Sequence, residues 1–184
     1  MFSTRTVINR SELMRLIPLT RGLFAMVDDA DYEMLSRFKW RAERGWKGTN
    51  TFYAITGQNK NGRKAIYMHR LLVNVPRGMF VDHKNTNPLD NQRDNLRPAT
   101  RLQNSFNLNK TRPSKSGYKG VFLRPIKSPI SAAKPWYVRL RCKVGFKIHG
   151  GYFATAEEAA RRYDELAHIH FGEFARPNFP RENP

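Results

Sequence analysis

The stretch Phe80-Val81-Asp82-His83 places a carboxylate beside an imidazole, directly after an apolar pair. Polar side chains follow at short intervals, in Asp90-Asn91, Asn95-Leu96-Arg97 and Gln103-Asn104. An adjacent Asp-His pair is common by chance. Its context favours a site for a divalent cation, because Mg²⁺ needs only one or two protein oxygen ligands and completes its shell with water and phosphate.

This combination of side chains suits the hydrolysis of a phosphodiester. The reaction needs a base that activates water, a cation that stabilises developing charge, and groups that position the phosphate. His83 is the candidate base, because imidazole titrates near neutral pH. Asp82 offers a carboxylate and Asn104 an amide oxygen to the cation. The alternative for Asp82-His83 is a solvated loop pair in a binding protein.

The spaced pattern around this pair resembles the HNH endonuclease signature, and more narrowly its homing-endonuclease-like branch in phages and bacteria. The elements that carry the resemblance are Met68-His69-Arg70, Val81-Asp82-His83, Asp90-Asn91, Asn95-Leu96-Arg97, Gln103-Asn104 and Asn107. The resemblance covers about residues 15 to 108 and implies a ββα-metal finger.

The resemblance also implies roles for individual residues. Asp82 would bind the metal, His83 would be the general base, and Asn95 would tie the loop and orient the histidine. Asn104 stands where the family has its final His or Asn, as the second metal ligand. The implied cofactor is Mg²⁺ or Mn²⁺, and an Asn in the last position makes the site less zinc-like.

Other polar residues have simpler interpretations. Asn91 and Asn95 also suit turns for backbone reasons alone. Asn107 shares a helix face with Asn104, and either touches metal or phosphate or is simply exposed. His69 either packs near the site or is a satisfied core histidine, and the second interpretation is favoured. Both histidines of the last predicted helix are interpreted as structural, and the single cysteine, Cys142, as a small core residue.

The charge balance points to an anionic partner. The 184 residues include 33 Lys and Arg against 15 Asp and Glu, for a net charge of +18. Nucleic acid is the commonest partner of such a chain, since neutralising phosphates releases counterions. The longest apolar run is far too short to span a bilayer, and the N-terminus lacks a signal-peptide pattern. We therefore expect a cytoplasmic protein of phage or bacterial origin that acts on double-stranded DNA in the host cell.

The overall expectation is an α+β protein in three parts. Residues 13–108 form the HNH nuclease domain with an N-terminal α+β extension, 109–117 a basic linker, and 118–180 a second DNA-binding domain. Strands are expected at Gly22–Val27, Thr51–Thr56 and Lys64–Tyr67, and a helix at Ala99–Leu108. Asp28 is expected to cap a short helix, and an Asn-Gly turn at 61–62 to close a hairpin.

The third part alternates clearly. Tyr118–Arg124, Trp136–Cys142 and Phe146–Phe153 predict three strands, and the capping box Thr155-Ala-Glu-Glu158 opens a helix to about His170. Small residues recur along that helix at helical spacing, which predicts a narrow face lying close on the sheet. We expect a three-stranded antiparallel sheet with one packed helix, and arginines and lysines on the other face.

This part resembles the APETALA/ethylene-responsive-factor (ERF) DNA-binding domain of plants. The resemblance rests on Tyr118-Lys-Gly-Val, the helix with Glu-Glu-Ala-Ala followed by Tyr163-Asp164, and Asn178-Phe-Pro. It implies a sheet that enters the DNA major groove. By position, the DNA-facing residues would be Lys119, Phe122, Arg124, Arg139, Arg141, Lys147 and His149. Phe122 and His149 depart from the plant pattern, and the stretch 125–135 is longer. A basic, solvated sheet face is the alternative.

Three functions therefore stand against one another. The first is a metal-dependent endonuclease that nicks DNA, with a separate targeting module and no small-molecule substrate. The second is a non-enzymatic, sequence-specific transcription regulator with a decayed nuclease region. The third is an RNA-binding accessory protein, which lacks the paired surface aromatics of an RNP-type motif. The oligomeric state stays open, with a monomer as the expectation.

Overall fold

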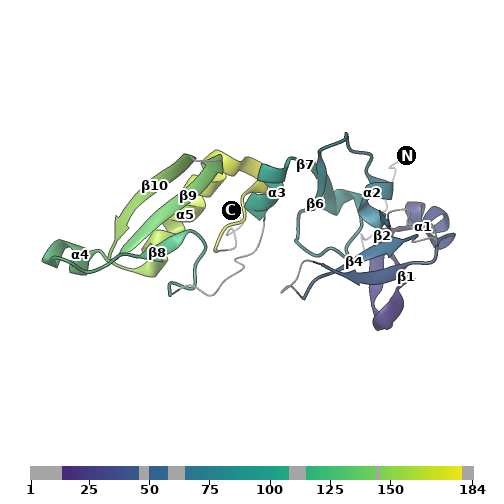
Figure 1. The fold of residues 1–184 in the computed structure, drawn as a ribbon, viewed down its shortest axis with the longest axis horizontal. Helices are drawn as coiled ribbons and strands as arrows, with labels where there is room; N and C mark the ends of the chain where they lie inside the picture. Colours follow the sequence, from purple (N-terminus) through teal and green to yellow (C-terminus); the bar gives the residue numbers. More distant parts are fainter. Residues whose placement is uncertain (1–13, 46–49, 58–64, 108–114, 144–145, 180–184) are drawn as a thin grey trace, which may run out of the picture. The chain divides into compact units, whose positions relative to one another are not determined.

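The computed structural model describes residues 14–45, 50–57, 65–107, 115–143 and 146–179 (Figure 1). The chain forms two compact units that divide between Ala99 and Thr100. Among the described residues, no helix is both long and apolar enough to cross a membrane.

Small antiparallel sheets and short helices make up the first unit. Its elements are β1 (Met14–Pro18), η2 (Thr20–Gly22), β2 (Phe24–Asp28), α1 (Asp29–Ser36), β3 (Arg41–Arg44), β4 (Phe52–Thr56), β5 (Ile66–Tyr67), α2 (Met68–Leu72), β6 (Phe80–His83), η3 (Arg93–Asn95) and β7 (Leu96–Ala99). β1 pairs with β2, β4 lies between β3 and β5, and β6 pairs with β7. The expected strands at 22–27, 51–56 and 64–67 correspond to β2, β4 and β5. The predicted turn at 61–62 lies outside the described residues.

One apolar core joins these sheets. It includes Val27 of β2, Leu35 of α1, Met68 of α2 and Val81 of β6, all buried. The Trp40 indole N–H donates to the Leu35 carbonyl oxygen at 2.7 Å, which satisfies its buried polar atom. The core therefore holds β6 in place through Val81, and β6 is the strand that carries Asp82 and His83.

The second unit is a three-stranded antiparallel sheet with one long helix across a face (Figure 1). Its elements are α3 (Arg101–Asn107), β8 (Val121–Leu123), α4 (Pro129–Ala133), β9 (Trp136–Lys143), β10 (Phe146–Phe153), α5 (Ala156–Phe171) and η4 (Gly172–Phe174). The sheet order is β10-β9-β8. The expected sheet and packed helix are confirmed for these residues. α4 falls in the longer stretch between the first two predicted strands and was not predicted.

Small residues let α5 lie close on this sheet. Ala160, Tyr163 and Ala167 are buried against Val138 and its neighbours, as the helical spacing predicts. A Cβ atom on Gly150 would lie 2.7 Å from Val138 Cγ1, so only glycine fits there. The capping box of Thr155 and Glu158 is present.

Two details differ from the sequence-based expectations. Ala99 ends strand β7, where it pairs with Phe80, and the expected helix at 99–108 begins at Arg101. Asp28 stands at the N-cap position of α1, but its side chain makes no capping hydrogen bond. The Asp28 carboxylate is used elsewhere, as the site geometry explains.

Candidate active site

The β6–β7 hairpin holds three of the predicted site residues, Asp82, His83 and Asn95. Asp82 lies opposite Arg97, and His83 lies opposite Leu96. Asn95 closes the connecting loop: its Oδ1 accepts from the Asn85 backbone N–H at 3.0 Å, and its Nδ2 donates to the Asp90 carbonyl oxygen at 2.8 Å. Asn95, at the end of the loop that follows His83, therefore ties itself to the start and to the middle of that loop.

The same loop is anchored to the start of α1. The Asp28 carboxylate accepts from the Arg93 backbone N–H at 2.8 Å and from Gln92 Nε2 at 3.2 Å. The Arg93 guanidinium makes a two-pronged pair with Asp31, with both distances at 2.7 Å. These bonds explain why Asp28 does not cap α1: its carboxylate holds the loop instead. An N-terminal acidic cluster thus helps position the site.

Asp82 is buried in an ion pair. Only 4% of the residue is exposed, and Arg97 is similarly buried. Arg97 Nε and Nη2 lie 2.8 Å and 2.7 Å from the same oxygen, Asp82 Oδ2. Both donors converge on this one oxygen, so the ion pair fixes its position. Sequence reasoning gave Arg97 no role, although antiparallel pairing of the two flanking strands would have placed it opposite Asp82.

His83 is equally buried, with 6% of the residue exposed. Burial lowers the pKa of His83 below its ordinary value, and this effect outweighs the nearby Asn91 side chain and the charges of Asp82 and Asp90, which raise it. The ring is therefore neutral at neutral pH, which is the form that accepts a proton.

His69 packs against His83 with its ring nearly perpendicular, at a centroid distance of 5.1 Å. His69 is buried, and it also packs near the site, so both interpretations of this residue hold. Burial, followed by the charges of His83 and Arg70, lowers the pKa of His69 to about 3. Tyr53 of β4 lies 6.0 Å from the His69 ring and 6.5 Å from the His83 ring. No spacing in the sequence links Tyr53 to the site, so this ring cluster was missed.

The donor set beside His83 fits a hard cation that retains water ligands. Asp82 and Asp90 are buried carboxylates and Asn91 a buried amide. Such oxygen donors suit Mg²⁺ or Mn²⁺. Among the described residues, no group of three or more His, Cys, Asp or Glu forms a ready-made metal cage. Asn104 lies half-buried on α3, in the second unit.

The residues expected to face DNA divide into two groups. Arg139, Arg141, Lys147 and His149 are exposed on the sheet of the second unit, and Phe122 is half-buried beside them. Lys119 and Arg124 are engaged within the protein. Lys119 Nζ donates to the Phe106 carbonyl oxygen, and burial lowers the pKa of Lys119 to about 8. Arg124 donates to carbonyl oxygens at the end of α4.

Residues 74–106, which include the β6–β7 hairpin, match a family described as HNH endonuclease. Together with a relative that carries the same name, this match supports an enzyme of the DNA nuclease class. The match does not extend into the sheet of the second unit.

Two relatives are similar to the chain. An uncharacterized HNH endonuclease of Acanthamoeba polyphaga mimivirus is 29% identical over 172 residues, which is 94% of this chain and 83% of the relative. Protein 3.8 of Escherichia phage T7 is 40% identical over 47 residues, which is 26% of this chain and 39% of that protein. No solved structure matches the chain.

Proposed function

We propose that this protein is a divalent-metal-dependent DNA endonuclease of the homing type, which nicks one strand with His83 as its general base. The observation that carries the proposal is the buried, neutral imidazole of His83 next to the buried carboxylate of Asp82, within the residues that match the nuclease family. The substrate we propose is double-stranded DNA in the cytoplasm of the host cell, for a protein of phage or bacterial origin.

Each site residue has a proposed part in the reaction. The neutral ring of His83 takes a proton from the attacking water. Asn95 keeps the loop after His83 closed, so the strand end that carries the base keeps its position. Asp82 holds the cation, with Asn104 as the second ligand that the resemblance assigns. When bound, Mg²⁺ or Mn²⁺ would stabilise the negative charge that develops on the phosphate and the leaving oxygen.

We also propose that the second unit is an ERF-like module that holds the DNA. The sheet and packed helix support this assignment, and so does the charge of the exposed sheet face. Between Asp94 and Glu157 the sequence has no acidic residue. Arg139, Arg141 and Lys147 would therefore meet phosphates without competition from nearby carboxylates.

A supercoiled plasmid tests the proposal. The wild-type protein should convert supercoiled DNA to the open circular form with Mg²⁺ or Mn²⁺ and should leave it unchanged with EDTA. A protein that binds the plasmid but yields no open circles with any divalent ion is a DNA-binding regulator, and that result refutes the nuclease assignment. Competition between duplex DNA and RNA in the same buffer separates a DNA enzyme from an RNA-binding protein.

A further inference from the structure

Three aromatic side chains stand in register across the exposed face of the second unit's sheet. Phe122 of β8 lies opposite Tyr137 of β9, which lies opposite Tyr152 of β10. The rings of Phe122 and Tyr137 are stacked at 5.4 Å, and Tyr137 and His149 are parallel at 5.9 Å. We call these four residues the ring row. Tyr152 is 46% exposed, so the row is open to a ligand at its β10 end.

Positive charge accompanies the ring row. The guanidinium of Arg139 lies 4.7 Å above the centre of the Phe122 ring, and that of Arg124 lies 4.3 Å above the Tyr152 ring. Arg141 of β9 pairs with Lys147 of β10 on the same side of the sheet, two residues beyond Arg139 along β9. The strands β8, β9 and β10 contain no acidic residue. The face is therefore complementary to an anionic ligand.

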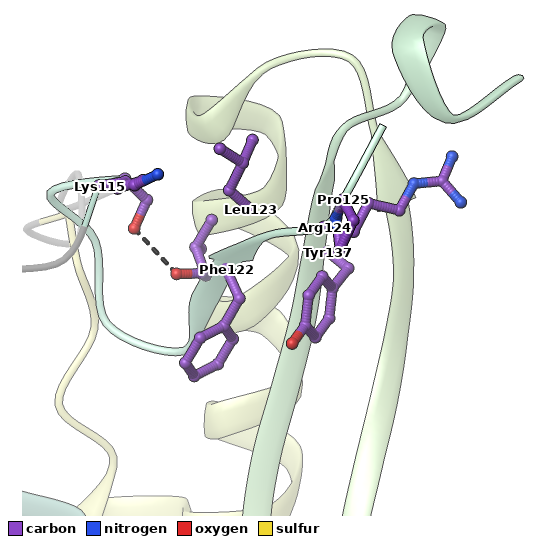
Figure 2. A pocket seen from close by; sticks show the side chains of 8 residues that line it. Lys115, Phe122, Leu123, Arg124, Pro125 and Tyr137 are labelled. Carbon is purple, nitrogen blue, oxygen red and sulfur yellow. Dashed lines mark hydrogen bonds between the residues drawn. The ribbon is translucent and has the colours of Figure 1, made fainter. Parts of the chain in front are cut away.

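A hollow of about 410 Å³ lies beside the rings at the open edge of the sheet (Figure 2). Apolar side chains line most of it, from Phe122, Leu123, Pro125 and Tyr137, with Lys115 on the opposite rim. Arg124 points away from Lys115 in this view, toward α4. The volume is within the range of small-molecule sites. An aromatic wall and an ammonium group on opposite sides suit a flat ring that carries a phosphate.

The chemistry of the row favours unpaired bases over base-pair edges. Reading an intact major groove relies on donors and acceptors such as guanidinium and amide groups. The three in-register positions offer one phenyl ring and two phenols instead. Aromatic side chains beside a basic groove are typical of proteins that stack unpaired bases, because every base has a π-face.

We propose that the ring row and its hollow bind an unpaired nucleotide of the DNA substrate. Bases stack against Phe122 and Tyr137, where they displace the Arg139 guanidinium from the Phe122 ring, and Lys115, Arg139 and Arg141 then contact the flanking phosphates. This inference rests on the proposed DNA nuclease function and adds a substrate class to it: duplexes with a gap, bulge or separated strand next to the bound segment.

Fluorescence anisotropy of the full chain in EDTA tests this proposal, with three labelled probes of the same sequence. The probes are a single strand, an intact duplex and a duplex with a gap of a few nucleotides. The gapped probe should bind about tenfold more tightly than the intact duplex, because only the gapped probe offers unpaired bases that can stack on the rings. Tyr137→Ala should remove most of this preference and change intact-duplex affinity about twofold at most. Tyr137→Leu keeps apolar bulk without an aromatic face and should behave in the same way.

Two control variants make the result specific. Arg141→Ala should weaken binding of all three probes similarly, because a phosphate contact carries no preference for pairing state. Phe24→Ala removes an exposed ring from the first unit and should leave the preference for the gapped probe unchanged.

Equal affinity of the wild-type protein for gapped and intact duplexes overturns the proposal, as does an equal loss on all probes in Tyr137→Ala. The nuclease proposal is judged separately by plasmid nicking. A protein that nicks plasmid but shows no gap preference refutes the ring-row proposal alone.

Discussion

At the scale of the residue, the site depends on two buried polar groups that are held by neighbours. Arg97 fixes the carboxylate of Asp82, and the rings of His69 and Tyr53 surround His83. Buried polar groups are costly unless they are paired, so Arg97 contributes both to stability and to the placement of the Asp82 carboxylate.

Replacing Arg97 with Met tests whether Asp82 is a metal ligand. Without metal, the free energy of unfolding of the variant should fall by about 3 kcal/mol or more, because removing Arg97 leaves the buried charge of Asp82 uncompensated. If Asp82 binds the cation, added Mg²⁺ should raise the unfolding temperature of the variant more than that of the wild type, since binding to the folded state alone stabilises it. Thermal unfolding across a Mg²⁺ titration measures this difference.

Arg93→Met is the matched control, because Arg93 pairs with Asp31 and not with Asp82. It should lower the unfolding temperature without a larger response to Mg²⁺. An Arg97→Met response equal to that of the wild type would contradict the assignment of Asp82.

His69 predicts how stability depends on pH. Its pKa is about 3 in the folded state, below the ordinary value of 6.5, so folding favours the neutral ring. The contribution of His69 to the free energy of unfolding is complete above pH 6.5. It is lost as the pH falls from 6.5 toward about 3, by up to ~1.4 kcal/mol for each pH unit. His69→Gln should flatten the wild-type decline in this window, as measured by urea unfolding at a series of pH values. His170→Gln, at an exposed position, should not flatten it, and parallel curves for His69→Gln and the wild type would refute the prediction.

At the scale of the element, polar side chains fasten segments that have few apolar contacts of their own. Asp28 and Asp31 hold the loop before β7, and Asp164 of α5 holds the end of the described chain. The Asp164 carboxylate accepts from the backbone N–H groups of Asn178 and Phe179, at 2.7 Å and 3.0 Å. The Asn178 Oδ1 in turn accepts from the Lys119 backbone N–H. One carboxylate therefore connects α5 to the chain before β8.

Asp164→Ala should destabilise the second unit by about 3 kcal/mol, because hydrogen bonds to a charged group contribute roughly 1.5–3 kcal/mol and the donors are left unpaired. Urea unfolding followed by circular dichroism measures the loss. Glu165→Ala removes an exposed pair with Arg162 and should change stability by less than about 1 kcal/mol. Similar losses for the two variants would show that Asp164 is no more than a surface charge.

At the scale of the whole molecule, the sequence predicted those helices and strands whose positions follow from hydrophobic periodicity and helix capping. The sheet of the second unit, the close packing of α5 and the capping box at Thr155 follow from local patterns. The site was predictable only in part. Asp82, His83 and Asn95 are close in sequence, whereas Tyr53 reaches His83 through the packing of β4, which no spacing encodes. The expectation that paired surface aromatics are absent is wrong, because Phe122, Tyr137 and Tyr152 align only through strand register.

If His83 is the base of a DNA-cleaving site, its removal should stop cleavage without weakening the binding of DNA. The most direct test is the rate of plasmid nicking by wild type and His83→Ala in Mg²⁺, measured together with the affinity of each protein for the same plasmid. The account predicts a loss of at least about 100-fold in nicking rate, the usual contribution of a positioned base, with DNA affinity within about twofold. A His83→Ala protein that nicks at the wild-type rate would contradict it.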